Sequence, residues 1–238
     1  MLAIILAGGK GTRLKPFTAT IPKPLLPIGD IPILEVVIQQ LVNAGFDRIV
    51  LTLNHMAHLF IAVIGDGTRW GITIEYTIED SPLGTAGSLK IVNDHEDNFL
   101  VMNGDLLTTL DYGAMYRHHL DSGAYGTIGA AIRQNYVDFG VLEVDDQGML
   151  LEYREKPSHS YQVSMGINIL SKKCLDYIPN NQKFDMPDLM LSMKDDGKPV
   201  HCFSSDCYWQ DIGRVDDFQK AGEDFAADSD KFLKKNLL

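Results

Sequence analysis

The sequence of 238 residues lacks several features that mark membrane and secreted proteins. Its three cysteines, Cys174, Cys202 and Cys207, are too few and too scattered for a disulfide framework or a four-ligand zinc site. No apolar run approaches the ~18 residues that a membrane span requires, so no membrane association is expected. The first residues carry no basic segment before a long apolar stretch, so no signal peptide is expected. These absences favour a cytoplasmic protein.

Basic residues are outnumbered by acidic ones: the sequence has 21 Lys and Arg and 32 Asp and Glu, which gives a formal net charge of −11. An anionic surface repels phosphate backbones, so no nucleic-acid polymer is expected as a partner. The exception is the segment 1–29, which holds Lys10, Arg13, Lys15 and Lys23 and no acidic residue. Four cations gathered in an anionic chain indicate a site for a small anion.

Apolar periodicity divides the chain into two parts. Up to residue 124, short apolar strands alternate with helical patterns, and the strand carboxyl ends are the expected place of the active crevice. After residue 124, strands separated by turn residues predict more antiparallel pairing. The pattern therefore predicts an α/β fold with a doubly wound, mostly parallel, Rossmann-like sheet and a more antiparallel portion. The expected strands are 2–6, 48–53, 72–78, 99–102, 125–132, 140–144, 149–154 and 163–170, and the expected helices 32–44, 55–64, 85–93, 185–194 and 215–227.

Two smaller features belong to this pattern. His118 and His119 are expected on the exposed face of a further helix. Asp185-Met186-Pro187-Asp188 is typical of a helix start, with Asp185 as the cap and Pro187 in the first turn.

The motif Leu6-Ala7-Gly8-Gly9-Lys10-Gly11-Thr12-Arg13-Leu14 follows the first strand directly. Three glycines in four positions let backbone N–H groups converge on one anion without Cβ atoms in the way. A P-loop is excluded because Ile4 stands where its first glycine is required, and a dinucleotide fingerprint fails at Leu14. The motif is thus a glycine loop in which Lys10 and Arg13 would meet polyphosphate oxygens.

This motif and the later ones resemble the signature of the sugar-phosphate nucleotidyltransferases, the nucleoside-diphosphate-sugar pyrophosphorylases. The motifs are closest to those of mannose and heptose 1-phosphate guanylyltransferases. The resemblance spans almost the whole chain, in the family's order, through Pro16-Phe17-Thr18, Pro22-Lys23-Pro24-Leu25-Leu26-Pro27-Ile28-Gly29, Leu83-Gly84-Thr85-Ala86-Gly87, Asn103-Gly104-Asp105, Glu155-Lys156-Pro157 and Trp209-Gln210-Asp211-Ile212-Gly213.

The resemblance implies that a nucleoside triphosphate and a sugar 1-phosphate give a nucleoside-diphosphate sugar and pyrophosphate. It implies that Arg13 and Lys23 are catalytic: Arg13 holds the leaving β,γ-phosphates, and Lys23 offsets the charge of the α-phosphate. It also implies that Asp105 and Asp211 converge on Mg²⁺, a hard cation that prefers oxygen ligands. From the residues alone, each aspartate would more simply be a turn or capping residue.

The resemblance further implies a nucleotide site and a sugar-phosphate site. Gly84-Thr85-Ala86-Gly87 is similar to members that use GTP. At the sugar end, Ser164 stands where several members have asparagine, so the motifs do not determine which sugar is bound. The implied nucleotide-binding residues are Leu6, Ala7, Gly8, Gly9, Gly11, Thr12, Arg13, Lys23, Gly84, Thr85 and Ala86, and the implied sugar-phosphate-binding residues are Gly140, Glu155, Lys156 and Ser164.

We therefore expect one domain, with a nucleotide-binding half over 1–124 and a sugar-binding half over 125–238 that closes over the second substrate. The expected pair is GTP with a mannose- or heptose-type 1-phosphate. Two alternative interpretations remain. The first is a thymidylyl-, uridylyl- or cytidylyltransferase that acts on another hexose 1-phosphate, and the second is a non-catalytic nucleotide-sugar sensor or regulatory subunit. The tail, 223–238, has apolar residues interspersed among charged ones, a pattern that predicts either a docked terminal helix or a homo-oligomer contact.

Overall fold

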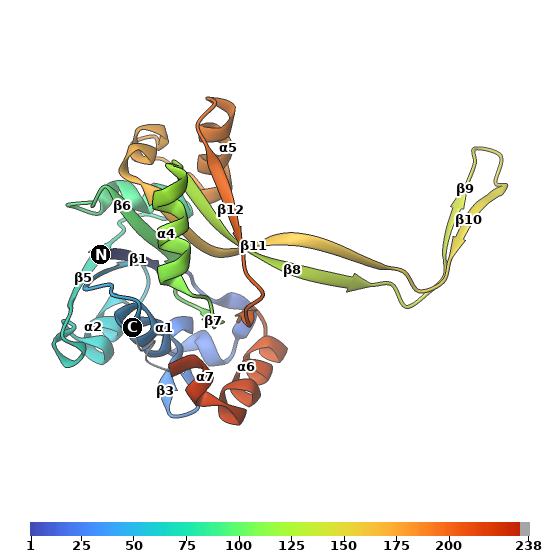
Figure 1. Ribbon diagram of the computed structural model, residues 1–238. Coiled ribbons are helices and arrows are strands. Elements are labelled where there is room, and N and C mark those ends of the chain that lie inside the picture. The colour runs from blue at the N-terminus through green and yellow to red at the C-terminus, as the bar shows by residue number, and fades with distance from the viewer. Residues whose placement is uncertain (234–238) are drawn as a thin grey trace.

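The computed structural model describes residues 1–233, and its centre is a seven-stranded mixed sheet (Figure 1). Four neighbouring strands run parallel, which confirms the doubly wound α/β fold that the sequence predicts. Along the sheet the order is β12 (Val200–Ser204), β8 (Gly126–Tyr136), β11 (Ser158–Ser171), β6 (Asn98–Asn103), β1 (Leu2–Leu6), β4 (Arg48–Leu53) and β5 (Thr73–Ile78), with β11 antiparallel to both of its neighbours.

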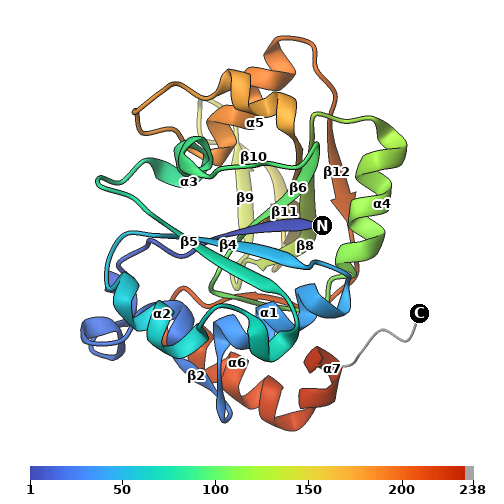
Figure 2. The ribbon, with the colours of Figure 1, turned by 90° about the vertical axis from the view of Figure 1, so that its left-hand side faces the viewer.

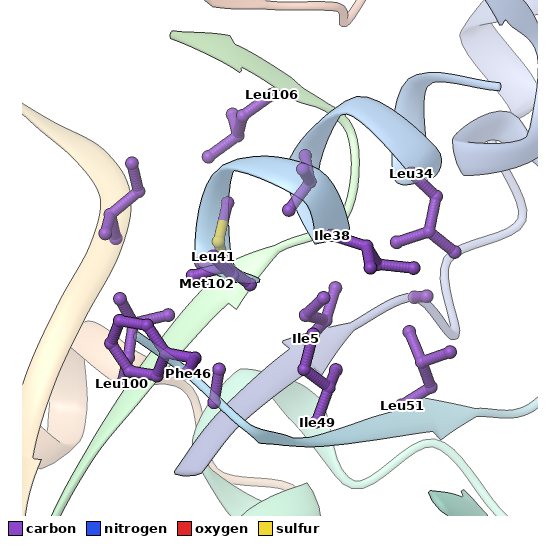
Figure 3. Close-up of a cluster of buried hydrophobic side chains, with 14 of the residues drawn as sticks. Ile5, Leu34, Ile38, Leu41, Phe46, Ile49, Leu51, Leu100, Met102 and Leu106 are labelled. Atoms are coloured by element: carbon purple, nitrogen blue, oxygen red, sulfur yellow. The ribbon is translucent and has the colours of Figure 1, made fainter. Parts of the chain in front are cut away.

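Strand β1 is apolar throughout because it faces a hydrophobic core on both sides of the sheet. Leu2 and Ile4 pack into one core, whereas Ala3 and Ile5 point into the other. Figure 3 shows the second of these cores, where Ile5 lies among side chains of the first helix and of the neighbouring strands. This two-sided burial fixes the strand, and with it the position of the glycine loop that follows.

Helices cover both faces of the sheet (Figure 2). None of those within residues 1–233 is long and apolar enough to cross a membrane. One face is covered by α1 (Ile33–Asn43), α2 (Ala57–Ile64) and α4 (Tyr112–Ser122), the other by α3 (Gly84–Gly87) and α5 (Met186–Asp195), and α6 (Val215–Ala227) and α7 (Ser229–Leu233) pack behind α1.

The expected helix over 85–93 is wrong in extent. Helix α3 ends at Gly87 and is followed by a 3₁₀ turn over Ser88–Ile91. The N–H groups of Ala86 and Gly87 both donate to the carbonyl oxygen of Phe184, which draws this short helix against a distant segment. Contacts of this kind, about a hundred residues apart in the chain, override the local helical pattern.

The tail is docked on its own chain as far as the structure describes it. Phe225 and Phe232 are 5% and 3% exposed and pack into a core with Leu14. The side-chain amide of Gln40 donates to the carbonyl oxygen of Phe232 at 2.9 Å. The apolar Leu237 and Leu238 lie outside the described residues. Of the two interpretations of the tail, the described part fits the docked helix.

The long strands β8 and β11 leave the main sheet together as a two-stranded arm (Figure 1). The arm, residues 132–164, ends in a hairpin of β9 (Val141–Val144) and β10 (Leu150–Arg154), joined by the turn expected at 145–148. None of its residues is buried. This part of the half expected to close over a second substrate therefore points away from the body of its own molecule.

Helix α4 carries a histidine whose placement corrects the sequence interpretation. His119 was expected on an exposed face, yet it is 1% exposed. Its Nδ1 lies 2.9 Å from the Thr127 hydroxyl and its Nε2 lies 3.0 Å from the Asn98 side-chain oxygen, an arrangement that satisfies a neutral imidazole. Burial, with smaller contributions from His118 and His201, lowers the pKa of His119 to about 4.

This lowered pKa makes stability depend on pH. Between pH ~6.5 and ~4 the unfolded chain binds a proton at His119, whereas His119 of the folded chain stays neutral. The stabilisation that comes from this neutral, buried histidine is therefore complete above pH ~6.5 and is lost as the pH falls towards ~4. We expect the free energy of unfolding in urea to fall by about 2–3 kcal/mol more over this range in the wild type than in His119→Gln. The matched control, His159→Gln on the exposed arm, should keep the wild-type slope; equal slopes in all three proteins would contradict the prediction.

Candidate functional site

A cavity of about 440 Å³ opens at the carboxyl ends of the parallel strands, where the sequence predicts the crevice. Its lining residues all lie between Leu6 and Asp105. They include every residue expected to bind the nucleotide except Ala86, which is buried beneath the surface. The cavity size suits a nucleotide-sized ligand.

The glycine loop curls over one end of this cavity. Gly11 has a φ of +58°, in the left-handed region that favours glycine, and a Cβ there would crowd Thr18 and Lys23. The Thr18 hydroxyl donates to the carbonyl oxygen of Gly11 at 2.7 Å and holds the curl. Leu14, 1% exposed, anchors the far end of the loop in the core, while Arg13 stays exposed. The loop therefore combines a fixed backbone with a free guanidinium.

Lys23 is the buried cation of the site. It lies in a 3₁₀ turn between Pro22 and Pro24 and is 8% exposed. Its ammonium forms an ion pair with Asp105 and lies 3.8 Å from the Asp211 carboxylate. A lysine is buried in this way where charged partners compensate for its lost hydration.

A short antiparallel pair of strands brings the two aspartates together. Strand β7 (Leu106–Thr108) pairs with β13 (Trp209–Asp211), and the register sets Asp211 opposite Leu106. Asp105 immediately precedes β7, and its carbonyl oxygen accepts from the Ile212 N–H at 3.2 Å. The chain thus joins two carboxylates that lie 106 residues apart in sequence around one ammonium.

The electrostatics of Asp211 favour an added cation. Burial raises the pKa of Asp211, the neighbouring Asp105 raises it further, and Lys23 and Arg13 lower it in part. Two hard oxygen donors facing one another are the ligand type that Mg²⁺ takes, with water and phosphate completing its shell. Within residues 1–233 no group of three or more His, Cys, Asp or Glu side chains forms a metal cage. The donors therefore fit a Mg²⁺ held jointly with a phosphorylated ligand.

Opposite the glycine loop, Gly84 and Thr85 form the other wall of the cavity. Gly84 has a φ of +79°, and a Cβ would overlap the backbone oxygen of Phe184 and the carboxylate of Asp185. Asp185 lies at the N-cap position of α5 as expected, but its side chain makes no capping hydrogen bond. Its carboxylate instead accepts from the Thr85 N–H at 3.0 Å, and the Thr85 hydroxyl accepts from the Met186 N–H at 2.7 Å. Helix α5 thereby fixes this wall.

The residues expected at the sugar end do not join the cavity. Gly140, Glu155 and Lys156 lie on the arm, and Ser164 lies where the arm leaves the sheet; none of the four lines the cavity. Within the arm, the Tyr153 ring occupies the space that a Gly140 side chain would need, and its hydroxyl donates to Glu155 at 3.1 Å. The structure thus separates the two expected half-sites within one molecule.

Six lining residues were not among the expected site residues: Pro24, Thr52, Glu79, Pro82, Ser88 and Asn103. Glu79 and Asn103 are the most informative of them. Glu79 follows β5 and accepts from the Leu83 N–H at 3.2 Å; burial raises its pKa. Asn103 ends β6, directly before Gly104-Asp105. Both stand at the carboxyl ends of parallel strands, and that position was the signal that could have identified them.

The fold and the cavity define an α/β protein whose glycine loop and buried cation face a nucleotide-sized cavity at the carboxyl edge of its sheet. The chain belongs to the nucleotidyl transferase family, whose sequence model matches residues 2–228. The family assignment confirms the resemblance that the motifs carry.

Individual relatives agree with this assignment. Over 93% of the chain, 36% of residues are identical to UTP–glucose-1-phosphate uridylyltransferase of Synechocystis, and 31% to D-glycero-α-D-manno-heptose 1-phosphate guanylyltransferase of Aneurinibacillus thermoaerophilus. The chain spans 62% of the length of the first and 96% of the second. HddC from Yersinia pseudotuberculosis, solved in complex with GMP-PN, is similar with a TM-score of 0.72 and 28% identity over 94% of this chain and 99% of that one.

Proposed function

We propose that the chain transfers a nucleotidyl group from a nucleoside triphosphate to a sugar 1-phosphate and releases pyrophosphate. The observation that carries this proposal is the contact of Lys23 with both Asp105 and Asp211, where Lys23 and Asp105 line a cavity walled by the glycine loop. Two anionic reactants must approach each other in such a transfer, and positioned cations lower the barrier by offsetting their repulsion.

The roles follow from the positions of the cations. Lys23, aimed by two prolines and buried, offsets charge at the α-phosphate as the sugar phosphate oxygen attacks it in line. Arg13 is exposed at the end of the loop, where it can hold the departing β- and γ-phosphates with two parallel hydrogen bonds. Asp105 and Asp211 would hold Mg²⁺, which supplies further charge neutralisation between nucleotide and sugar phosphates when bound.

The proposed nucleotide is GTP and the proposed sugar a mannose- or heptose-type 1-phosphate. The Gly84-Thr85 wall supports this, since Asp185 holds its backbone at the cavity and Gly84, which has no side chain, lets a base edge approach closely. So does a guanylyltransferase relative of nearly the same length. The Synechocystis relative makes UTP with glucose 1-phosphate the second candidate.

Thermal unfolding with each nucleoside triphosphate and Mg²⁺ separates the two candidates. A ligand that binds only the folded state raises the apparent stability by about 2.7 kcal/mol at one hundred times its dissociation constant. We expect GTP to raise the melting temperature by several degrees more than UTP, dTTP, CTP or ATP. A larger shift with UTP would replace GTP by the second candidate.

Pyrophosphate release with a panel of sugar 1-phosphates then tests the reaction itself. Turnover with the selected nucleotide is expected for one class of sugar. Nucleotide binding without pyrophosphate for any sugar in the panel would favour a sensor or regulatory subunit over an enzyme.

A further inference from the structure

The hairpin at the tip of the arm has two unlike faces. Residues that pair across an antiparallel ladder share a face, and Glu143 lies opposite Glu152 with Arg154 pairing to both carboxylates. That face is charged and satisfied within the hairpin. The opposite face is apolar and formed by Leu142, Val144, Leu150 and Tyr153, which are 55–59% exposed.

The rest of the arm exposes further large apolar side chains. A two-stranded hairpin alone is only marginally stable in water, and monomeric proteins rarely expose large apolar patches. At about 150–250 Å² per buried aromatic side chain, the four exposed rings of the arm offer roughly 400–600 Å² summed over both of its faces, against the ~800 Å² that each partner buries in a stable complex. Outside the hairpin these side chains lie on both faces of the arm, with Ile132 and Tyr136 on one face and Tyr161 on the other.

The arm is built to hold its tip away from its own body. Its strands pair in continuous register from Ser158 opposite Tyr136 to Ser164 opposite Ala130, over roughly 20 Å at ~3.3 Å per residue. Where it leaves the sheet, the register shifts between Ser164 and Asn168, and Gly166 has a φ of +72°. Folding back onto its own cavity would require this paired ladder to break.

The tip also carries charged residues that do not line the cavity of their own molecule. Lys156 has a φ of +44°, a conformation that costs energy for a residue with a Cβ and that clusters at ligand-binding positions. The adjacent Glu155 is held by Tyr153 of the apolar face. The cavity, for its part, is lined only by residues up to Asp105. Each molecule therefore holds a strained charged motif on its arm, and its nucleotide-sized cavity is lined without that motif.

We propose that two copies of this chain form a symmetric dimer in which each arm docks through its apolar face on the other copy and brings Glu155 and Lys156 to that copy's cavity. A second copy is the occupant because it lacks what the arm supplies, and the exchange is reciprocal about a two-fold axis. The receiving body has exposed apolar side chains in segments next to the cavity: Phe17 and Ile21 lie between Arg13 and Lys23, and Ile78 precedes Glu79. The delivery of a sugar-phosphate site in trans rests on the proposed function; the docking of the arm does not.

Sedimentation velocity tests the docking. The wild type is expected to sediment with twice the mass of one chain, and the arm variant Leu142→Ser/Leu150→Ser as a monomer. The matched control is Leu120→Ser/Leu191→Ser, two equally exposed leucines on helices of the body, which should remain dimeric. A monomeric wild type at tens of micromolar, or an arm variant that stays dimeric, would overturn the proposal.

Mixed dimers test the delivery in trans. Lys23→Ala and Lys156→Ala chains with different tags are co-expressed, and the dimer carrying both tags is purified. If the arm acts on the partner, one of the two sites in this dimer is intact and about half of the wild-type rate returns, although each variant alone is inactive. If the arm acted on its own cavity, both sites would be damaged and the mixed dimer would be as inactive as its parents, which would refute delivery in trans. A wild type without any transferase activity would instead count against the proposed function, and the sedimentation result would still decide the docking.

Discussion

Lys23→Ala is expected to lower turnover by ~10²-fold or more, because it removes a fixed, desolvated cation from the place where negative charge develops. Lys23 is 8% exposed and in contact with two carboxylates, so its ammonium is already positioned before any ligand binds. No solvent reorganisation is then required at the moment of reaction. The measurement is initial-rate pyrophosphate release at saturating concentrations of both substrates.

The matched control for this variant is Lys194→Ala. Lys194 also forms an ion pair with an aspartate, Asp195 at 3.1 Å, but on an exposed helix away from the cavity. It should keep the wild-type rate, since exposed ion pairs contribute little. The far-ultraviolet circular dichroism of Lys23→Ala should match that of the wild type. A rate within a few-fold of the wild type in a folded Lys23→Ala protein would remove Lys23 from the proposed mechanism.

The parallel half of the fold was predictable from sequence because its signals are local. The β1 segment is a continuous apolar run that ends at a glycine loop, the β4 segment is rich in β-branched residues, and the structure places both strands with the expected bounds. Helix α6 likewise spans Val215–Ala227 as its periodicity predicts. In each case the order of apolar and polar residues within the segment itself matches the burial pattern of the folded protein.

The departures arise where distant segments decide the outcome. Helix α3 is shortened by hydrogen bonds to Phe184, and His119 is buried by Thr127 and Asn98. Neither partner is visible in the local pattern. The arm is a stronger case: alternating strands and a turn were identified, but the direction in which a ribbon leaves a sheet depends on a register shift that no periodicity encodes.

The candidate site also has parts that are predictable from local sequence and parts that depend on distant segments. The anion-binding character of the glycine loop can be deduced from its glycine spacing and the cations within it, whereas the role of Lys23 came from resemblance to a family. The proximity of Asp105 and Asp211 came from resemblance to a family; in the structure it has a physical cause, the pairing of β7 with β13. The separation of Glu155 and Lys156 from the cavity could not be deduced from either source, because it concerns the relation between parts of the chain and not the identity of the motifs.

The proposed reaction is expected to stop when Mg²⁺ is removed. Asp105 and Asp211 face each other with one full ammonium between them, and two further phosphorylated reactants bring more negative charge than Lys23 and Arg13 can offset. A divalent cation that neutralises several of these charges contributes several kcal/mol to the transition state, or ~10³-fold or more in rate. EDTA in excess should therefore abolish pyrophosphate release, and added Mg²⁺ should restore it.

Two controls make this experiment specific. EDTA already loaded with Mg²⁺ should leave the rate unchanged, which excludes inhibition by the chelator itself. Asp211→Asn should need a higher Mg²⁺ concentration for half-maximal rate, because a neutral amide binds the cation more weakly than a carboxylate, whereas the exposed Asp188→Asn on α5 should not. Full turnover in EDTA, or an unchanged Mg²⁺ requirement in Asp211→Asn, would mean that the two aspartates serve only to hold Lys23, and the charge of the reacting phosphates would have to be offset by Lys23 and Arg13 alone.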